Sequence, residues 1–160
     1  MSDFSKIIEK SCQNVETVKA QMAQKGEYIS LTRGCSMRPL FREHKDIVVI
    51  RPLARPLKKG DVVLYPDKNG TQYILHRIMR FKGDTLVIRG DNNLFTEYIP
   101  RENIIGILVE FYRSGKHVVC EKSLKYKLYV FYIMHSYWLR YSVRKIRTTL
   151  GKIKRKIFKK

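Results

Sequence analysis

The sequence predicts a mainly β fold, an antiparallel sheet or partly open barrel, with one helix at each end. Seven short segments rich in Val, Ile and Tyr are separated by turns of Gly, Asp, Asn and Ser, which is typical of antiparallel strands. Helical periodicity is confined to the two ends of the 160-residue chain. The pattern excludes alternating β–α units, which need a helix between successive strands.

The first segment, residues 1–26, is expected to be an amphipathic N-terminal helix over 3–25. Its apolar residues recur at helical spacing among Lys, Glu and Gln: Phe4, Ile7, Ile8, Val15, Val18 and Met22. Ser2 or Asp3 is expected to cap the helix, and Gly26 to end it. The segment has no continuous apolar stretch like that of a cleavable signal peptide.

The middle segment, residues 27–121, is expected to form one β domain. Its predicted strands are 27–33, 46–52, 61–66, 72–81, 85–89, 104–112 and 116–120. Three cysteines, Cys12, Cys35 and Cys120, are too few and too scattered for a disulfide framework. No Cys or His cluster has metal-ligand spacing, so we expect neither a metal nor a cofactor.

The last segment, residues 122–160, is strongly basic. It contains 13 of the 33 Lys and Arg residues and no acid, so it carries +13 of the net charge of +19. An aromatic block of 12 residues, LYVFYIMHSYWL, is too short to span a bilayer. An Ile, Leu and Val stripe at helical spacing follows it, which predicts a helix in the interface of an anionic membrane. The residues expected to contact lipid are Trp138, Arg140, Arg144, Lys145, Arg147, Lys152, Lys154, Arg155 and Lys156.

Two other partners for this helix stay open. Its apolar face could pack on the β domain, with the charges merely solvated. Nucleic acid is the less favoured partner, because the chain shows no helix-turn-helix or zinc-finger pattern and the stripe is too apolar for a pure phosphate-binding arm.

A candidate nucleophile follows the first predicted strand, in the motif GCSMRP (34–39). Gly34 frees the backbone before Ser36, and Pro39 restricts it afterwards. The backbone N–H groups of Cys35 and Ser36 are then expected to point together, as an oxyanion-binding pair does. The alternative is an ordinary serine in a surface turn.

The motif is one of five that occur in a particular order: GCSMRP (34–39), KGDVV (59–63), LHRI (75–78), RGDNN (89–93) and IG (105–106). This order resembles the type I signal peptidase family, whose superfamily includes the self-cleaving LexA-like repressors, over roughly residues 28–110. The resemblance implies a LexA/signal-peptidase-like β fold, with residues 27–121 as the catalytic domain.

The resemblance also implies roles. Ser36 matches the nucleophile, and His76 stands where most bacterial members have a lysine base. A histidine there is similar to the branch found in the endoplasmic reticulum, archaea and some bacteria. Neutral imidazole is able to accept the serine proton near pH 7. The acid that orients His76 is Asp91 or Glu97, and the branch has an aspartate where this chain has Glu97.

Two further departures concern the serine motif. Many members have a hydroxyl residue where this chain has Gly34, although the LexA-like relatives also have glycine there. Cys35 is unusual beside a nucleophile: a small buried filler, the commoner role of a free cysteine, is the favoured interpretation, and a reactive thiol stays open as the alternative.

We therefore expect a serine endopeptidase of the signal peptidase type, which cleaves an extended leader or signal peptide after small residues. Its expected location is the surface of the cytoplasmic membrane, peripheral or interfacial. Family members usually have an apolar anchor before the serine; here a specialised leader peptidase, or a partner subunit that supplies the anchor, stays open. Two alternatives are a catalytically silent peptide-binding protein and a self-cleaving LexA-like protein, cut near Ala20 or Ala23.

Overall fold

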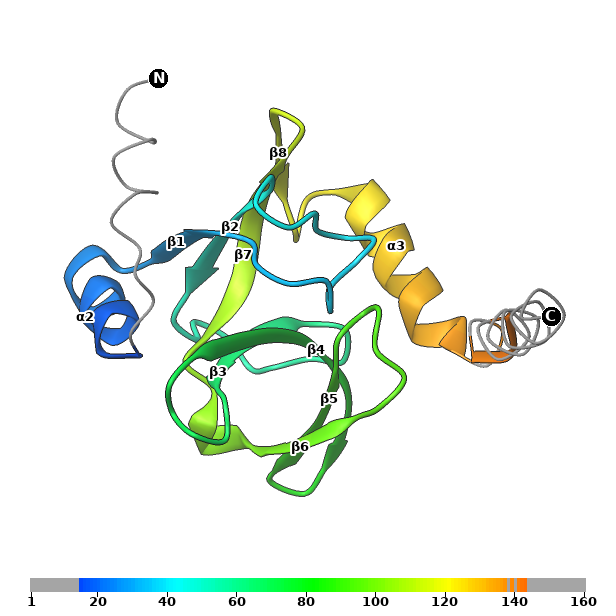
Figure 1. Ribbon diagram of the computed structural model, residues 1–160, viewed down its shortest axis with the longest axis horizontal. Helices are drawn as coiled ribbons and strands as arrows, with labels where there is room; N and C mark the ends of the chain where they lie inside the picture. Colours follow the sequence, from blue (N-terminus) through cyan, green and yellow to red (C-terminus); the bar gives the residue numbers. More distant parts are fainter. Residues whose placement is uncertain (1–14, 138, 140, 144–160) are drawn as a thin grey trace, which may run out of the picture.

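An antiparallel sheet dominates the computed structural model, which describes residues 15–137, 139 and 141–143 (Figure 1). The strands are β1 Tyr28–Leu31, β2 Ile47–Arg51, β3 Val62–Pro66, β4 Tyr73–Lys82, β5 Thr85–Arg89, β6 Glu97–Pro100, β7 Gly106–Arg113 and β8 Lys116–Val119. A 3₁₀-helix, η1, covers Arg101–Asn103.

The sheet has eight strands in the order β1-β2-β7-β3-β4-β5-β6, and β8 pairs with β7 outside this path. Every pair is antiparallel. This confirms the predicted mainly β fold class. The end strands β1 and β6 are not paired with each other, so the sheet is not closed into a barrel.

Strand β3 separates two hydrophobic cores, because successive side chains of a strand point to opposite faces. Val62 and Leu64 contribute to one core, together with residues of β2 and β7. Val63 and Tyr65 contribute to the other, together with residues of β4 and β5. Both faces of β3 are therefore buried, which places its side chains close to any site built on β4.

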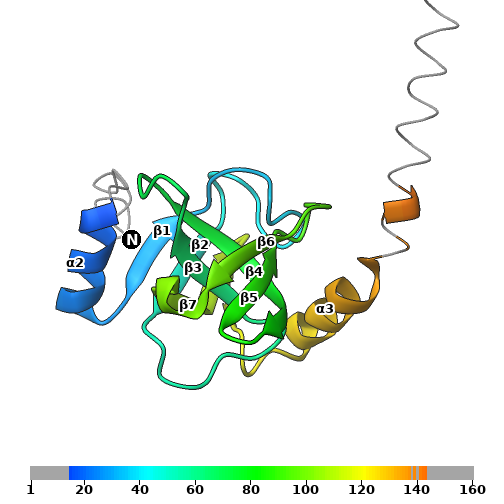
Figure 2. The same cartoon turned by 90° about the horizontal axis from the view of Figure 1, so that it is seen from below.

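Helix α2 (Val15–Lys25) lies at one end of the sheet (Figure 2). Val18 and Met22 are buried in the first core, as their helical spacing predicts. Gly26 has a φ of +70° and ends the helix, and its N–H donates to the Met22 carbonyl at 2.9 Å. Residues 3–14 of the predicted helix lie outside the described residues.

Helix α3 (Leu124–His135) lies at the opposite end (Figure 2). The Ser123 side chain caps it by accepting a hydrogen bond from the Tyr126 N–H at 3.2 Å. Ile133 is buried, and Val130 lies so close to Gly60 that a Cβ on this glycine would be 2.7 Å from Val130 Cγ1. The inner face of α3 is therefore packed on the domain.

Among the described residues, no helix is long and apolar enough to cross a membrane. The residues predicted to contact lipid, from Trp138 onward, lie outside the described residues.

Candidate active site

Ser36 lies in a turn that is fixed at both ends. Gly34 has a φ of +74°, in the left-handed region that favours glycine. Its N–H donates to Glu43 Oε1 at 2.9 Å. Met37, which follows the serine, is buried in the first core. The turn thus leaves Ser36 half-buried at the edge of the core.

Cys35 differs from its expected role. It is exposed, whereas Cys120 is buried. The prediction of a buried filler at position 35 is wrong, because the turn directs Met37 rather than Cys35 into the core.

His76 lies on β4 and is buried. Its strand partner is Val63, at the centre of β3. A Cβ built on Gly90 would lie 2.9 Å from His76 Nε2 and 2.7 Å from the Ser36 backbone oxygen. Gly90 therefore marks the point where the serine turn and the histidine ring converge, and the absence of a side chain there permits that approach.

The loop after β5 ties the serine turn in place. The Asn92 N–H donates to the Ser36 carbonyl at 2.7 Å, and Asn92 Nδ2 donates to the Cys35 carbonyl at 3.2 Å. The RGDNN motif thus positions the GCSMRP motif, although the two are more than 50 residues apart in the chain.

Two side chains contact the other ring nitrogen of His76. Glu97 Oε1 lies 3.0 Å from His76 Nδ1, and the Tyr65 hydroxyl lies 2.9 Å from it. The Tyr65 hydroxyl donates to Glu97 Oε2 at 3.1 Å. In the sheet, Glu97 of β6 is paired with Ile88 of β5, which is paired with Ile78 of β4. His76 is two residues before Ile78, so its side chain lies on the same face of β4. This shared face of three strands brings Glu97 and His76 together.

These contacts select the tautomer of neutral His76. A carboxylate only accepts hydrogen bonds, and the single Tyr65 hydroxyl hydrogen is given to Glu97. Nδ1 therefore carries the ring hydrogen, and Nε2, which faces Gly90, is free to accept a proton. Burial lowers the pKa of His76 below its ordinary value of 6.5, and the charges of Glu97 and Asp91 oppose this shift.

Asp91 forms a buried ion pair with Arg77, the residue that follows His76 on β4. Arg77 Nε donates to Asp91 Oδ1 at 2.8 Å, and Arg77 Nη2 donates to Oδ2 at 2.7 Å. The Tyr129 hydroxyl of α3 also donates to Oδ2, at 2.9 Å. Both candidate acids thus lie beside the histidine strand, but the carboxylate in hydrogen-bond contact with the His76 ring is that of Glu97.

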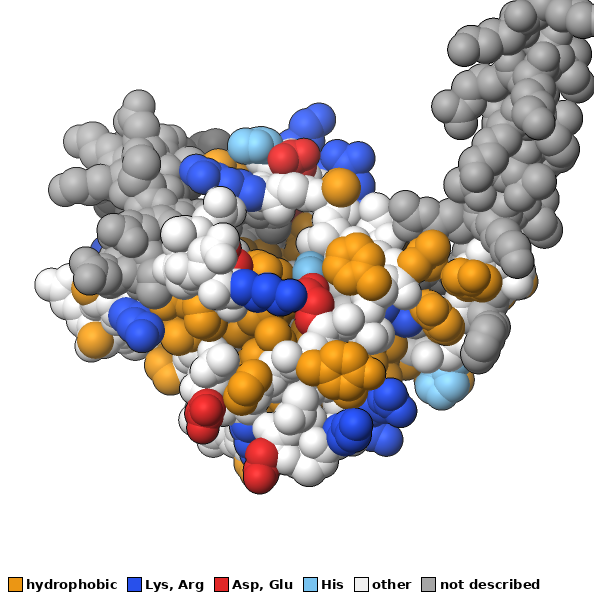
Figure 3. All heavy atoms as spheres, turned by 60° about the horizontal axis from the view of Figure 1, so that its bottom comes forward, with side chains coloured by type: hydrophobic (Ala, Val, Ile, Leu, Met, Phe, Trp, Pro, Cys, Tyr) orange, Lys and Arg blue, Asp and Glu red, His pale blue; other side chains and the backbone are white. Residues whose placement is uncertain are grey.

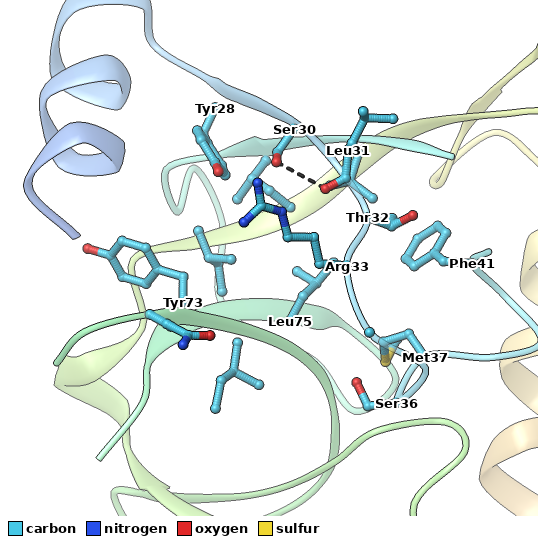
Figure 4. Close-up of a pocket in the computed structure, with 16 residues that line it drawn as sticks. Tyr28, Ser30, Leu31, Thr32, Arg33, Ser36, Met37, Phe41, Tyr73 and Leu75 are labelled. Carbon is cyan, nitrogen blue, oxygen red and sulfur yellow. Dashed lines mark hydrogen bonds between the residues drawn. The ribbon is translucent and has the colours of Figure 1, made fainter. Parts of the chain in front are cut away.

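A groove of about 500 Å³ opens beside Ser36 (Figure 4). Tyr28 and residues 30–34 form one wall, and residues 72–75 form the other. β1 is the end strand of the sheet, so one of its backbone edges is unpaired. Residues 73–76 of β4 pair with β3 on one side only, because pairing of β4 with β5 starts at Arg77. Two strand edges therefore face a groove that leads to the serine.

Arg77 and Asn92 lie within the motifs found in the sequence, but the sequence analysis assigned no role to Tyr65, Arg77, Asn92 or Tyr129. Tyr65 is two residues from the strand partner of His76, and such diagonal neighbours contact each other, so a known β3–β4 register would have indicated it. The other three histidines take no part: His117 contacts Glu110, His135 contacts the Phe131 carbonyl, and His44 is exposed beside Glu43.

No three His, Cys, Asp or Glu side chains gather at a metal-binding distance anywhere in the described part of the chain. The His76 imidazole and the Glu97 carboxylate lie beside the turn that carries Ser36, and side chains of these types are used in acid–base and nucleophilic chemistry.

The chain is similar to the signal peptidase complex catalytic subunit SEC11 of Fusarium vanettenii. The two are 35% identical over 91 residues, which cover 48% of this chain and 52% of that protein. The chain thus spans about half the length of this curated relative. No family model matches the sequence. The sequence similarity and the antiparallel β fold agree with each other, and both support the resemblance to the type I signal peptidase family.

Proposed function

We propose that this chain is a serine endopeptidase of the signal peptidase type. The observation that carries the proposal is the convergence at Gly90 of the Ser36 turn and His76 Nε2, with Glu97 on the opposite ring nitrogen. A nucleophile, a base and a group that orients the base are the three parts that serine hydrolases need.

In the proposed mechanism, Ser36 Oγ attacks the scissile carbonyl carbon and His76 Nε2 takes the hydroxyl proton. The positive charge that develops on the ring is stabilised by Glu97 at 3.0 Å. His76 then gives the proton to the leaving amine, and the acyl-enzyme is hydrolysed by water in the same way. Asp91 supports this arrangement through Arg77 rather than through the ring.

The oxyanion of the tetrahedral intermediate would accept hydrogen bonds from the backbone N–H groups of Cys35 and Ser36. Within the described residues, neither N–H donates a hydrogen bond to another group. Gly34 adds no side-chain donor, so catalysis would depend on these backbone donors alone.

The substrate would be an extended leader or signal peptide that adds as a strand in the groove. Such a peptide would hydrogen-bond to the edge of β1, of β4, or of both. SEC11 is by its name the catalytic subunit of a signal peptidase complex, and this supports a preprotein as substrate and leaves room for a partner subunit here. Cleavage after small residues is carried over from the family resemblance.

The test is cleavage of short Ala-x-Ala signal-type peptides and a set of longer leader peptides by the wild type, Ser36→Ala and His76→Ala. We expect cleavage by the wild type and its loss in both variants, with unchanged folding by circular dichroism. Equal cleavage by the Ser36→Ala variant would refute the proposal. A folded wild type that binds leader peptides but cuts none would favour the silent peptide-binding alternative.

We further propose that the protein associates with an anionic membrane through α3 and the basic segment after it. Leu124, Leu128, Phe131 and Tyr132 are more than half exposed, and their spacing places them on one outer side of α3. Figure 3 shows hydrophobic side chains gathered over this part of the molecule. An exposed apolar stripe beside a strongly basic segment is typical of interfacial helices.

Flotation with anionic and neutral vesicles tests this part. Leu128→Glu should weaken binding to anionic vesicles, because a carboxylate would enter the interface and repel the lipid. Lys68→Gln, on the exposed turn between β3 and β4, lowers the net charge by the same single unit elsewhere and serves as the control. Equal binding by both variants and the wild type would contradict the role of α3.

A further inference from the structure

One charged side chain lines the groove beside Ser36. Sixteen residues line this groove, and Arg33 is the single one among them that carries a charge. Figure 4 shows the Arg33 side chain extending from the segment after β1 into the groove, between the wall that contains Ser30 and the wall that contains Tyr73. Any peptide that lies in the groove therefore passes close to this guanidinium.

Arg33 has no acidic partner in the part of the chain that the structure describes. Among the described residues, no ion pair or hydrogen bond involves its side chain. Other arginines of the same region do have partners: Arg42 binds Asp46 at 2.7 Å, and Arg51 binds Glu27 at 3.1 Å. Arg33 is also exposed, so its charge faces water and is available to a ligand in the groove.

The position of Arg33 relative to Ser36 limits where a ligand carboxylate would lie. Three positions separate the two residues in the chain, and both line the same groove. An extended chain advances about 3.3 Å per residue, so a peptide bound at Ser36 would bring a side chain to Arg33 within a few residues of the scissile bond.

We propose that Arg33 selects substrates that carry an Asp or Glu side chain within a few residues of the cleavage site. This inference rests on the proposed function and adds a substrate class to it. A guanidinium binds a carboxylate through two parallel N–H···O bonds. The described residues that line the groove include no acid that would compete for Arg33, whereas a basic substrate side chain would be repelled there.

A binding experiment tests the inference without cleavage. Peptides of one leader sequence, with Glu moved through successive positions and matched Gln versions, are titrated into the full-length Ser36→Ala protein by fluorescence anisotropy. We expect a Glu peptide at one or two positions to bind about tenfold more tightly than its Gln version, the scale of a charge-assisted hydrogen bond. Arg33→Gln should remove this preference, and Arg33→Glu should transfer it to a Lys peptide.

Arg101→Gln is the matched control, because it removes one exposed arginine charge from a protein whose net charge is +19 without touching the groove. Nonspecific attraction of acidic peptides would weaken equally in both variants. Equal binding of Glu and Gln peptides to the Ser36→Ala protein, no binding of either, or a preference that survives in Arg33→Gln would each overturn the inference.

Cleavage of the same peptides by the wild type separates this inference from the proposed function. If the Glu preference is present in binding and no peptide is cut, the endopeptidase proposal fails and the acidic selection stands. If peptides are cut with equal kcat/KM for Glu and Gln versions, the endopeptidase proposal stands and Arg33 is not a specificity residue.

Discussion

Gly90→Ala should separate the two halves of the proposed active site. The added Cβ would lie 2.7 Å from the Ser36 backbone oxygen and 2.9 Å from His76 Nε2, whereas ordinary contacts of this kind are 3.4–4 Å. The groups must therefore move apart by about 0.5–1 Å. Neither moves freely, because the Ser36 carbonyl accepts a 2.7 Å hydrogen bond from Asn92 and the His76 ring contacts Glu97 at 3.0 Å.

The expected magnitude follows from this displacement. Overpacking of a dense site costs about 1–3 kcal/mol of unfolding free energy, and a misplacement of about 1 Å lowers catalytic rates about 10²-fold. We expect the kcat for peptide cleavage to fall about 100-fold while the protein stays folded. Urea unfolding followed by circular dichroism, together with steady-state kinetics on one cleaved peptide, measures both quantities.

Gly106→Ala is the control for crowding alone. A Cβ there would lie 2.7 Å from the Arg51 backbone oxygen and 2.8 Å from Ile50 Cγ2, away from the histidine. It should lower stability to a similar degree and leave the kcat of the folded protein nearly unchanged. A folded Gly90→Ala protein with a kcat within about twofold of the wild type would refute the reasoning that this approach is needed for catalysis.

Three other predictions concern the groups around the histidine. Because burial lowers the pKa of His76, the acid limb of the kcat/KM profile should lie below 6.5; Glu97→Gln should move it further down, because the Glu97 charge raises that pKa, and should lower kcat about 10- to 100-fold. An unchanged acid limb in Glu97→Gln would exclude this role. Tyr65→Phe removes the hydroxyl that donates to Glu97, and we expect about a tenfold loss of kcat with near-wild-type KM; a loss confined to KM would contradict it. Asp91→Asn should lower the free energy of unfolding in urea by about 3–5 kcal/mol, because Arg77 would keep a buried charge without its counter-charge. Glu97→Gln should cost far less stability, since the Glu97 side chain is 24% exposed, and the reverse order of the two losses would refute this comparison.

The strands could be predicted because each has a local signal. All seven predicted segments correspond to strands, since their Val, Ile and Tyr residues fill a sheet that is buried on both faces at β3. Strand β6 was missed: Glu97–Pro100 is short, alternates half-buried and exposed residues, and ends in a proline. It depends on pairing with β5, which the local sequence does not reveal.

The site could be predicted in part. The positions of Ser36, His76, Asp91 and Glu97 came from motif order, and the structure brings their elements together. Which acid contacts the ring depends on register: pairing of β6 with β5 puts Glu97 in the row of Ile88 and Ile78. Local sequence patterns do not reveal which residues of β4, β5 and β6 lie opposite one another, so the choice between the two acids could not be made before the fold was known.

The hydrogen bond from Tyr129 to Asp91 has a consequence for where the domain ends. Composition places a boundary at residue 121, yet a cut there would remove the helix whose tyrosines cover the Arg77–Asp91 pair. Arg77 follows His76 on β4, and Asp91 follows Gly90 in the loop after β5, so this ion pair clamps β4 to the loop that holds the serine turn. A chain shortened to residue 121 would let water reach the clamp, and the alignment of the proposed nucleophile with its base would loosen. Helix α3 is thus a structural support of the proposed active site, although it follows the β strands in the chain.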